Sequence, residues 1–422
     1  MEKPVFDKKT IAAWCSYDFA NSIYYAVIPS TIWSSYYANQ IVGNTDGLGD
    51  LWWGKVVSTS MLIVAIISPI MGTIGDQAKI RKRLLAIYTL VSVLATCFLG
   101  LVSPGMVLFG FLLSVISFVG LEGALVFYNS YLPEIAPEDY QGRVSGWGFA
   151  LGYAGSLMGL MVVLPFIQKN QYGMAFLITG LGFLLFALPS LIWLPKDVKG
   201  EVTVKQATKS ALKVTWETLQ LVRNTPKMRN YLLAYFFYED GTNTVINMSA
   251  IFASKTLGFA ATELIILFAI VQISALLGSL LWAKPTDRFG GKRIILILLV
   301  QWCMVVIATY FVQTKLQFFI IAIFAGSGLG AIQSASRAMM SSLVPKGKEA
   351  EIFGLYALCG KSASIMGPLL FGIVSIYSQG NQRLSILSVL IFYVIGAILL
   401  TRCKSPQKQI PQENISVANV AS

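Results

Sequence analysis

Long apolar stretches alternate with short polar segments along almost the whole chain of 422 residues. A helix needs about 20 apolar residues to cross the hydrocarbon core of a bilayer, and twelve stretches meet this requirement. The pattern therefore predicts an all-α integral membrane protein with twelve transmembrane helices. They are expected near residues 10–38, 51–74, 84–103, 106–132, 143–167, 172–194, 230–254, 261–283, 292–313, 316–342, 352–378 and 384–401.

Two loops of related sequence indicate that the twelve spans form two repeats of six. Residues 72–83 and residues 283–293 each place an acid and a basic cluster after the second span of one half. Their acids, Asp76 and Asp287, lie 211 residues apart, which is half of the chain. Duplicated six-span units that rock against each other are typical of membrane carriers. The sequence therefore predicts two pseudo-symmetric six-helix bundles.

The repeats set the expected domain boundaries. Residues 1–195 and 230–402 are predicted to form the two bundles, and residues 403–422 a disordered cytoplasmic tail. The linker between the bundles, residues 196–229, carries eight basic residues and one predicted amphipathic helix. We expect this helix to lie along the cytoplasmic membrane surface. Its apolar face consists of Leu212, Trp216, Leu219 and Val222.

The basic residues predict the orientation of the chain in the membrane. The formal net charge is +12, although charged residues are only 12% of the sequence. With the N-terminus placed in the cytoplasm, 25 of the 32 Lys and Arg residues fall in cytoplasmic segments and five at outer ends. This asymmetry follows the positive-inside rule and places both termini in the cytoplasm. The charge thus reports topology and indicates no nucleic-acid partner. We expect a multi-pass protein of the bacterial inner membrane.

The sequence also excludes several kinds of chemistry. It contains no histidine, and its five cysteines show no spacing typical of metal ligands. Imidazole general bases and imidazole metal ligands are therefore absent. We predict no metal site and no cofactor, and we expect the protein not to be an enzyme. A membrane enzyme is further disfavoured because the chain has no soluble catalytic domain.

Ionisable side chains inside the spans are the candidates for function. Each costs about 2.5–3.5 kcal/mol on insertion scales, so each should face a cavity or a partner. Asp18 and Asp240 are interpreted as proton carriers, while Glu239, some 100° away on the same helix, is ranked below Asp240. In the alternative interpretation, each acid pairs permanently with a basic residue and holds two helices together. The predicted solute and proton site comprises Asp18, Asn21, Glu122, Asn129, Asp240, Asn243, Gln333 and Lys361.

The two repeated loops are predicted to close the cytoplasmic side. Their acids should form ion pairs and contact the N-terminus of a neighbouring helix. Arg337, near the cytoplasmic end of the tenth span, is expected to pair with Asp287, and a clamp on a solute carboxylate is the alternative. The predicted gating residues are Asp76, Arg81, Lys82, Asp287, Arg288, Lys292 and Arg337.

Several motifs resemble those of one transporter family. The repeated loops resemble the signature between the second and third spans of the major facilitator superfamily. More narrowly, the chain resembles the vacuolar amino-acid effluxer (autophagy protein 22-like) family and its bacterial branch. The segments that carry this likeness are residues 14–22, 128–133, 142–146, 333–337 and 354–361. The resemblance implies the twelve-helix facilitator fold and secondary transport of a small solute, such as an amino acid.

The expected function is secondary active transport of a small polar solute by alternating access. Transport is expected to be coupled to protons, and the other expected partner is the lipid bilayer. We expect a monomer. Two alternatives remain open: an uncoupled facilitator or exchanger of another metabolite, and a receptor on the same fold that binds its ligand without transporting it.

Overall fold

The computed structural model describes residues 7–43, 47–198, 200, 202–363 and 366–403. All regular elements in these residues are helices. The first half contains α1 (Lys8–Val27), α2 (Ile32–Tyr36), the π-helical η1 (Tyr37–Val42), α3 (Leu48–Gln77), α4 (Arg81–Leu99), α5 (Val107–Ser130), α6 (Leu132–Ile135), α7 (Gln141–Gln168) and α8 (Tyr172–Trp193). The linker forms α9 (Val204–Asn224). The second half contains α10 (Pro226–Leu257), α11 (Ala261–Phe289), α12 (Gly291–Phe311), α13 (Lys315–Ser341), α14 (Glu349–Ser362), α15 (Met366–Tyr377), α16 (Gln382–Ser388) and α17 (Leu390–Thr401).

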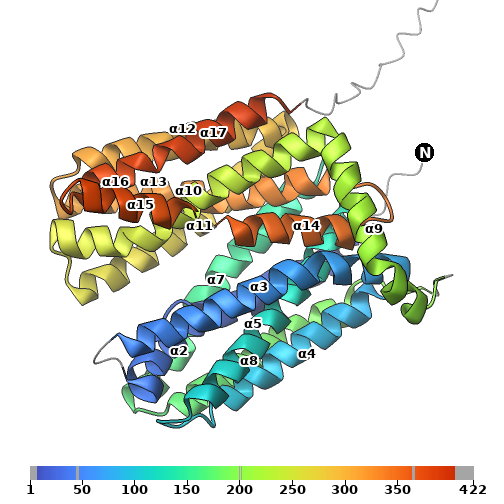
Figure 1. Cartoon of the computed structure of the whole chain (residues 1–422), viewed down its shortest axis with the longest axis horizontal. Helices are drawn as coiled ribbons and strands as arrows, with labels where there is room; N and C mark the ends of the chain where they lie inside the picture. The colour runs from blue at the N-terminus through green and yellow to red at the C-terminus, as the bar shows by residue number, and fades with distance from the viewer. Residues whose placement is uncertain (1–6, 44–46, 199, 201, 364–365, 404–422) are drawn as a thin grey trace, which may run out of the picture.

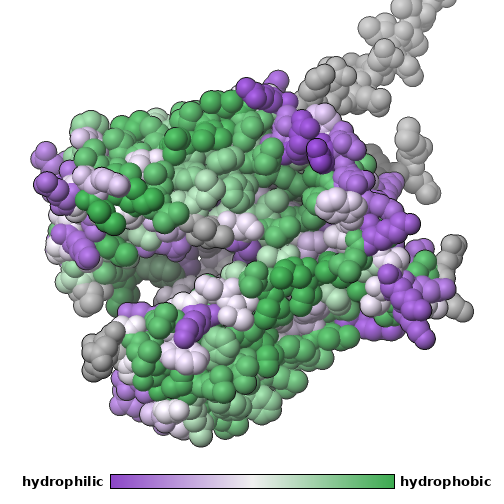
Figure 2. All heavy atoms as spheres, in the orientation of Figure 1, coloured by the Kyte–Doolittle hydropathy of each residue, from purple (hydrophilic) through white to green (hydrophobic). Residues whose placement is uncertain are grey.

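The helices account for the twelve predicted spans. In the described part of the chain, ten segments are long and apolar enough to cross a membrane, with α14 and α15 forming one of them and α16 and α17 another. The remaining two spans are α1 and α10, which carry Asp18, Glu239 and Asp240. Apolar side chains such as Leu62 and Leu281 are mostly exposed on the outside of the bundle. Figure 2 shows this apolar outer surface, which suits a lipid environment because the helices satisfy their own backbone groups.

Three predicted spans are interrupted. The span expected at 10–38 is divided into α1, which ends at Val27, and α2, which begins at Ile32. The sequence suggests continuous helices at 352–378 and 384–401, whereas α14 ends at Ser362 and α15 begins at Met366. Similarly, α16 and α17 are separated at Val389. In membrane carriers, a broken span is tolerated where it borders a cavity or is buried in protein. The break between α14 and α15 lies beside the central polar residues described below.

Caps outside the spans define where some helices begin. The Thr10 hydroxyl and the Lys9 amide donate hydrogen bonds to Asp7, which lowers the pKa of that carboxyl and caps α1. At α9, Thr203 and Gln206 form a reciprocal capping box. These contacts start each helix at the surface, where its first amide groups lack partners within the helix.

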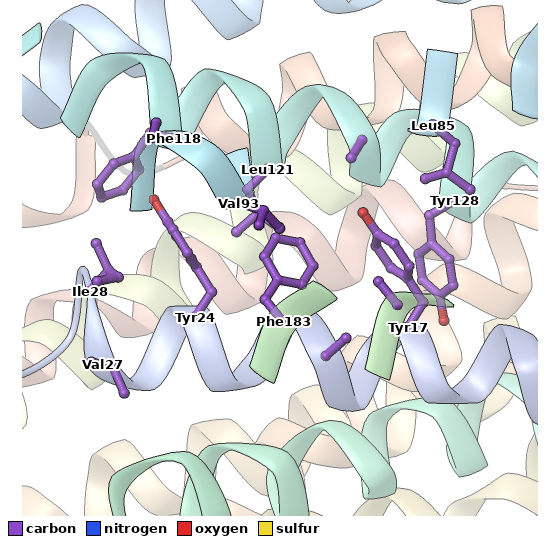
Figure 3. Packing of buried hydrophobic residues seen from close by; sticks show 14 of the residues in the cluster. Tyr17, Tyr24, Val27, Ile28, Leu85, Val93, Phe118, Leu121, Tyr128 and Phe183 are labelled. Atoms are coloured by element: carbon purple, nitrogen blue, oxygen red, sulfur yellow. The ribbon is translucent and has the colours of Figure 1, made fainter. Parts of the chain in front are cut away.

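Each half has its own main cluster of buried apolar residues. One cluster takes nearly all its members from residues 11–194 and the other from residues 222–403. Figure 3 shows α1 in the first cluster, with Tyr17 and Tyr24 pointing toward α4 and α5. Tyr17 Oη lies 2.6 Å from Thr89 Oγ1, and Ser117 Oγ donates to Tyr24 Oη at 2.9 Å. These buried hydroxyl groups are therefore satisfied while the rings pack in the core.

Small residues bring α1 and α7 into close contact. A Cβ atom at Gly155 would overlap the carbonyl oxygen of Phe19, whereas a Cβ atom at Gly54 would meet nothing within 4 Å. We expect Gly155→Ala to lower the stability of the purified protein by about 1–3 kcal/mol, because the helices must separate. Gly54→Ala is the matched control and should leave thermal unfolding unchanged or slightly improved. Equal unfolding temperatures for the two variants would contradict this packing.

We call the end of the molecule at which α1 begins, α17 ends and α9 lies the terminal face (Figure 1). At this face α9 contacts both halves. Ser210 Oγ donates to Gln77 Oε1 at 3.1 Å, and Lys348 Nζ donates to Thr218 Oγ1 at 2.6 Å. Figure 2 shows the surface hollowed between the two halves at the end away from α9. The halves therefore meet at the terminal face and diverge toward the other end.

Candidate functional site

Asp76 connects the first repeated loop to the opposite half. It lies near the end of α3 and accepts a hydrogen bond from the amide of Glu351, in the first turn of α14, at 2.9 Å. The Glu351 carboxylate in turn accepts from Thr73 Oγ1 at 3.1 Å and from Lys348 Nζ at 3.0 Å. A carboxylate is stabilised at a helix N-terminus by the unpaired amides and the helix dipole. Asp76 therefore holds the start of α14 against α3.

Asp287 makes the equivalent contact in the second repeated loop. Its carboxylate accepts hydrogen bonds from the Gly142 amide at 2.6 Å and the Arg143 amide at 3.1 Å, both at the start of α7. It also forms an ion pair with Arg143, whose Nε lies 2.7 Å from Oδ2. The two loop acids thus bind helix N-termini of the opposite half in a pseudo-symmetric way. The sequence predicts contact of each acid with a neighbouring helix N-terminus, whereas the structure adds that each helix belongs to the opposite half and that Arg143 takes part.

The backbones of the two halves approach closely between these contacts. A Cβ atom at Gly72 would overlap the Ala350 carbonyl, and one at Gly146 would lie 2.6 Å from the Ala283 Cβ. Only glycine allows helices to pack at such short range. The passage between the halves is therefore closed at the terminal face, while the surface is hollowed at the other end (Figure 2).

Asp18 and Arg337 form a buried ion pair that joins the two halves. Arg337 Nη2 lies 2.7 Å from Asp18 Oδ2, and Nη1 donates to Oδ1 at 3.2 Å, so the contact is bidentate. Both side chains are less than 10% exposed. The carboxylate comes from α1 and the guanidinium from α13. A bidentate geometry of this kind fixes the orientation of both groups.

The guanidinium of Arg337 has further partners. It donates to Ser145 Oγ at 3.0 Å, to the Ser145 carbonyl at 2.9 Å and to Asn129 Oδ1 at 3.4 Å. The Trp14 and Phe149 rings lie 4.6 and 4.1 Å from it. The expected pair between Arg337 and Asp287 is therefore wrong: Arg337 pairs with Asp18, because Asp287 is occupied by Arg143 and the start of α7. Asp18 and Asn129, two residues of the predicted solute and proton site, both contact Arg337 in this cluster.

A second ion pair crosses between the halves nearer the hollow. Lys361 Nζ, near the end of α14, lies 2.7 Å from Glu122 Oε1 on α5. Tyr25 Oη donates to the same carboxylate oxygen at 2.6 Å. Glu122 is almost fully buried, whereas the Lys361 side chain is 31% exposed. The structure thus brings together two residues that the sequence proposes separately, Glu122 and Lys361.

Gln333 and Glu239 lie in the same polar region. Tyr153 Oη donates to Gln333 Oε1 at 2.7 Å, which connects α7 with α13 across the halves. Glu239 on α10 is 9% exposed, and the Lys361 charge acts on its carboxylate. In the part of the chain that the structure describes, no hydrogen bond or ion pair to that carboxylate occurs. Glu239 therefore differs from the other acids of the bundle.

Asp240, Asn21 and Asn243 have mainly local contacts. The Asp240 carboxylate accepts from the Gly367 amide at 3.0 and 3.1 Å, at the start of α15. Asn243 Nδ2 donates to the Ala363 carbonyl at 3.3 Å, where α14 ends. Asn21 Nδ2 donates to the Tyr17 carbonyl at 2.8 Å and to Asp18 at 3.4 Å. Asp240 and Asn243 thus stabilise the two ends of the break in the eleventh span.

The remaining predicted gating residues have unequal roles. Arg81 reaches Glu134 at 2.5 Å and, in the opposite half, Glu349 at 3.7 Å, so it adds a contact between the halves. Lys82 donates to the Leu194 carbonyl at 2.6 Å, just beyond the end of α8. Lysines are favourable at helix C-termini, where carbonyl groups lack partners. Lys82 therefore stabilises the first half rather than the contact between halves.

Lys292 repeats the contact of Lys82 in the second half. It donates to the Thr401 carbonyl at 2.9 Å, at the end of α17. Arg288 lies over the ring of its neighbour Phe289, 5.3 Å from the centroid. Among the described residues, no group of three or more acids or cysteines could hold a metal ion.

Comparison with known proteins agrees with this architecture. Residues 55–410 match the family model described as vacuole effluxer Atg22 like. The chain belongs to this family. It is 31% identical to the uncharacterized MFS-type transporter YxiO of Bacillus subtilis, over 92% of this chain and 93% of that protein. Autophagy-related protein 22 of Yarrowia lipolytica is 24% identical, over 83% of this chain and 75% of that protein.

Solved structures establish the fold of this Atg22-like protein. The human organic anion transporter MFSD10 gives a TM-score of 0.73 at 11% identity, covering 94% of this chain and 100% of that one. The proton:xylose symporter XylE gives a TM-score of 0.71 at 16% identity, covering 93% and 94%. The chain therefore has the twelve-helix major facilitator fold and is a membrane transporter of a solute. Homologues of this kind are not enzymes.

Several residues of the Atg22-like site escape prediction from single positions. Ser145 and Arg143 fall in the motif at 142–146, but Arg143 stands at the end of a predicted span, where basic residues are common, and a serine does not by itself indicate a function. Tyr25 and Tyr153 belong to a set of span tyrosines that usually anchor helices at membrane interfaces. Glu351 follows Lys348 at the i,i+3 spacing of a helix, which is the one sequence signal for the ion pair between them.

Proposed function

We propose that this Atg22-like protein is a secondary active transporter that moves a small polar solute by alternating access and couples this movement to protons. One observation carries the proposal: both buried ion pairs, Asp18 with Arg337 and Glu122 with Lys361, have one partner in each half. Buried charges in a membrane bundle are costly unless they are paired. A rocking motion of the halves therefore has to exchange these partners, which provides a means of coupling.

The proposed orientation places the terminal face in the cytoplasm. The basic residues of the N-terminal segment, the repeated loops and α9 lie at this face or beside it, as the positive-inside rule requires. Arg81, Lys82 and Lys348 all make contacts there. The conformation described is then closed toward the cytoplasm and hollowed toward the opposite side. We propose a monomer in a bacterial plasma membrane with both termini inside.

We assign proton coupling to Glu122. In the described conformation its carboxylate is neutralised by Lys361 and accepts from Tyr25. When the halves move apart at this level, Lys361 leaves with α14 and Glu122 stays on α5. An unpaired carboxylate in a low-dielectric interior is strongly disfavoured, so Glu122 binds a proton in that conformation. The proton is released when Lys361 returns. The transported solute class that we propose is an amino acid, which the family resemblance implies.

Flux measurements on the purified protein in proteoliposomes test this function. Uptake of a mixture of labelled amino acids should rise when a pH gradient is imposed, and solute addition should change the internal pH. Glu122→Gln should abolish accumulation driven by the gradient while preserving counterflow, because the neutral side chain imitates the protonated acid. Glu217→Gln on the exposed face of α9 is the control.

Each other result contradicts part of the proposal. Flux that is indifferent to the gradient in the unaltered protein would indicate an uncoupled facilitator or exchanger. Ligand binding with no flux would indicate a receptor. Accumulation by Glu122→Gln equal to that of Glu217→Gln would exclude Glu122 as the coupling group.

A further inference from the structure

The charges in the centre of the bundle do not balance. Asp18 is neutralised by Arg337, and Glu122 by Lys361. Asp240 accepts a hydrogen bond from the Gly367 amide, in the first turn of α15. Glu239 is 9% exposed and, among the described residues, receives no hydrogen bond and no ion pair of its own. A buried carboxylate without a partner is costly inside a membrane bundle, so this position calls for a positive group from outside the chain.

Tyrosine rings lie near this carboxylate, and Tyr235 stands one turn before Glu239 on the same face of α10. Its charge acts on the hydroxyl groups of Tyr235, Tyr356 and Tyr153, which places these side chains near it. The Tyr235 and Tyr356 rings stack with centroids 4.2 Å apart. Their helices are α10 and α14, while Tyr153 comes from α7 of the opposite half. The electron-rich faces of tyrosines attract organic cations, and a carboxylate adds the charge that fixes them.

The amide side chain of Gln333 is hydrogen-bonded to one of these tyrosines. Gln333 accepts from Tyr153 through its Oε1, which leaves its amide hydrogens available to a ligand. Residue 360 is glycine, and a Cβ atom there would lie 2.8 Å from the Tyr235 hydroxyl. Glycine at 360 therefore allows the Tyr235 hydroxyl to pack directly against the backbone of α14. The region combines one negative charge, several rings and a neutral amide.

We propose that Glu239 binds the ammonium group of the transported solute, with Tyr235, Tyr356 and Tyr153 around that group. This inference rests on the proposed transport function and narrows it to solutes that carry a protonated amine. An ammonium group neutralises Glu239 and contacts rings contributed by both halves, so its binding draws the halves together. The roles of the two central glutamates are then distinct: Glu122 handles the proton and Glu239 the solute.

A metal ion fits this position less well. Two or more additional oxygen ligands of acidic type are usual for Mg²⁺ or Ca²⁺. No cluster of three acids or cysteines occurs among the described residues. Tyrosine rings would be poor neighbours for a hard cation that requires oxygen ligands. The environment of Glu239 thus suits an organic cation.

Thermal stabilisation of the full-length protein in detergent tests the assignment. Three probe mixtures are compared: the standard amino acids other than lysine, arginine and histidine, their amides, which retain the amine, and their Nα-acetyl derivatives, which retain the carboxylate and no amine. Ligands that bind the folded state raise its stability by mass action. The first two mixtures should stabilise the unaltered protein and the third should not. Glu239→Gln should weaken binding of the first two by about tenfold to a hundredfold, and Glu239→Asp should recover part of it.

The control variant is Glu263→Gln, which removes a surface acid paired with Lys315 and should retain full binding. Stabilisation by the N-acetyl mixture equal to that by free amino acids would overturn the proposal, as would no stabilisation by any mixture. Retained amine binding by Glu239→Gln, with loss of solute-driven proton movement, would also overturn it and assign the proton to Glu239.

The two proposals fail in different ways. Gradient-driven flux of a solute that has no amine would overturn the role of Glu239 and leave the transport function standing. Amine binding that depends on Glu239, in a protein that shows no flux, would overturn the transport function and leave the role of Glu239 standing.

Discussion

Arg337→Gln is expected to lower the stability of the protein by about 3–5 kcal/mol, because it leaves the Asp18 carboxylate buried without its cation. Among the described residues, the side-chain hydrogen bond that Asp18 keeps with Asn21 is long, at 3.4 Å. The variant also loses the hydrogen bonds to Ser145. Thermal unfolding of the purified protein, together with its yield in the membrane, measures this effect.

The double variant Asp18→Asn with Arg337→Gln separates the contribution of charge to stability from the contribution of packing. Removing both partners leaves no uncompensated ion, so a large part of the lost stability should return. Lys213→Gln is a suitable control, because Lys213 lies 3.9 Å from Glu217 with both side chains mostly exposed. Such surface pairs contribute little to stability. A double variant less stable than either single variant would show that the pair is not held by charge.

A neutral pair should also change transport. Asp18 and Arg337 connect α1 to α13 beside the closed end of the passage. Without their attraction, the conformation closed at the terminal face loses one contact between the halves. We therefore expect the double variant to fold and yet to transport more slowly, since the conformation hollowed away from α9 is less populated. This outcome would separate the role of the pair in folding from its role in the transport cycle.

The sequence predicts the membrane architecture well, for physical reasons. Apolar length determines the spans, and the repeat of Asp76 and Asp287 identifies two acids that indeed contact helix N-termini in the opposite half. A helix N-terminus is a local feature that any nearby acid can bind. The repeated sequence pattern alone therefore predicts that each acid contacts a helix N-terminus. The additional partner Arg143 lies 144 residues from Asp287 and carries no local mark.

Pairing between distant spans could not be predicted. Asp18 and Arg337 are separated by 319 residues, and both were candidates for several partners. Which cation meets which acid depends on how the two halves pack, and burial makes every unpaired arrangement costly. Arg337 does not pair with Asp287, because Arg143 already forms an ion pair with that acid.

Glu239 and Asp240 show how a helix break changes such an assignment. Their side chains point about 100° apart on a continuous helix, and the sequence favours Asp240. In the structure Asp240 is engaged by the start of α15, because the eleventh span is interrupted between α14 and α15. Pro368 lies in the first turn of α15 and predicts a bend in this span, although not that α14 ends as early as Ser362. The start of α15 supplies an amide that binds Asp240. The carboxylate of the adjacent Glu239 therefore remains available for other contacts.

Asp287→Asn is expected to shift the protein strongly toward the conformation that is open at the terminal face. The carboxylate accepts two backbone hydrogen bonds and pairs with Arg143 at 2.7 Å. Hydrogen bonds to charged groups are worth about 1.5–3 kcal/mol each, and asparagine can replace only part of them. We expect the ratio of open to closed molecules to rise by about tenfold to a hundredfold. Asp76→Asn should have the smaller effect, because Asp76 has one backbone donor at 2.9 Å and a more distant Arg81 at 3.9 Å.

Spin labels on Lys79 and Lys346 can measure this shift. The two lysines come from opposite halves and line a pocket of about 520 Å³ at the terminal face, so their separation should increase when that face opens. The five native cysteines are first replaced, and the two labelled positions then give one distance distribution per variant. Asp287→Asn should populate the longer distance more than Asp76→Asn. The reverse order, or two unchanged distributions, would mean that these carboxylates do not hold the closed conformation and that the packing at Gly72 and Gly146 suffices.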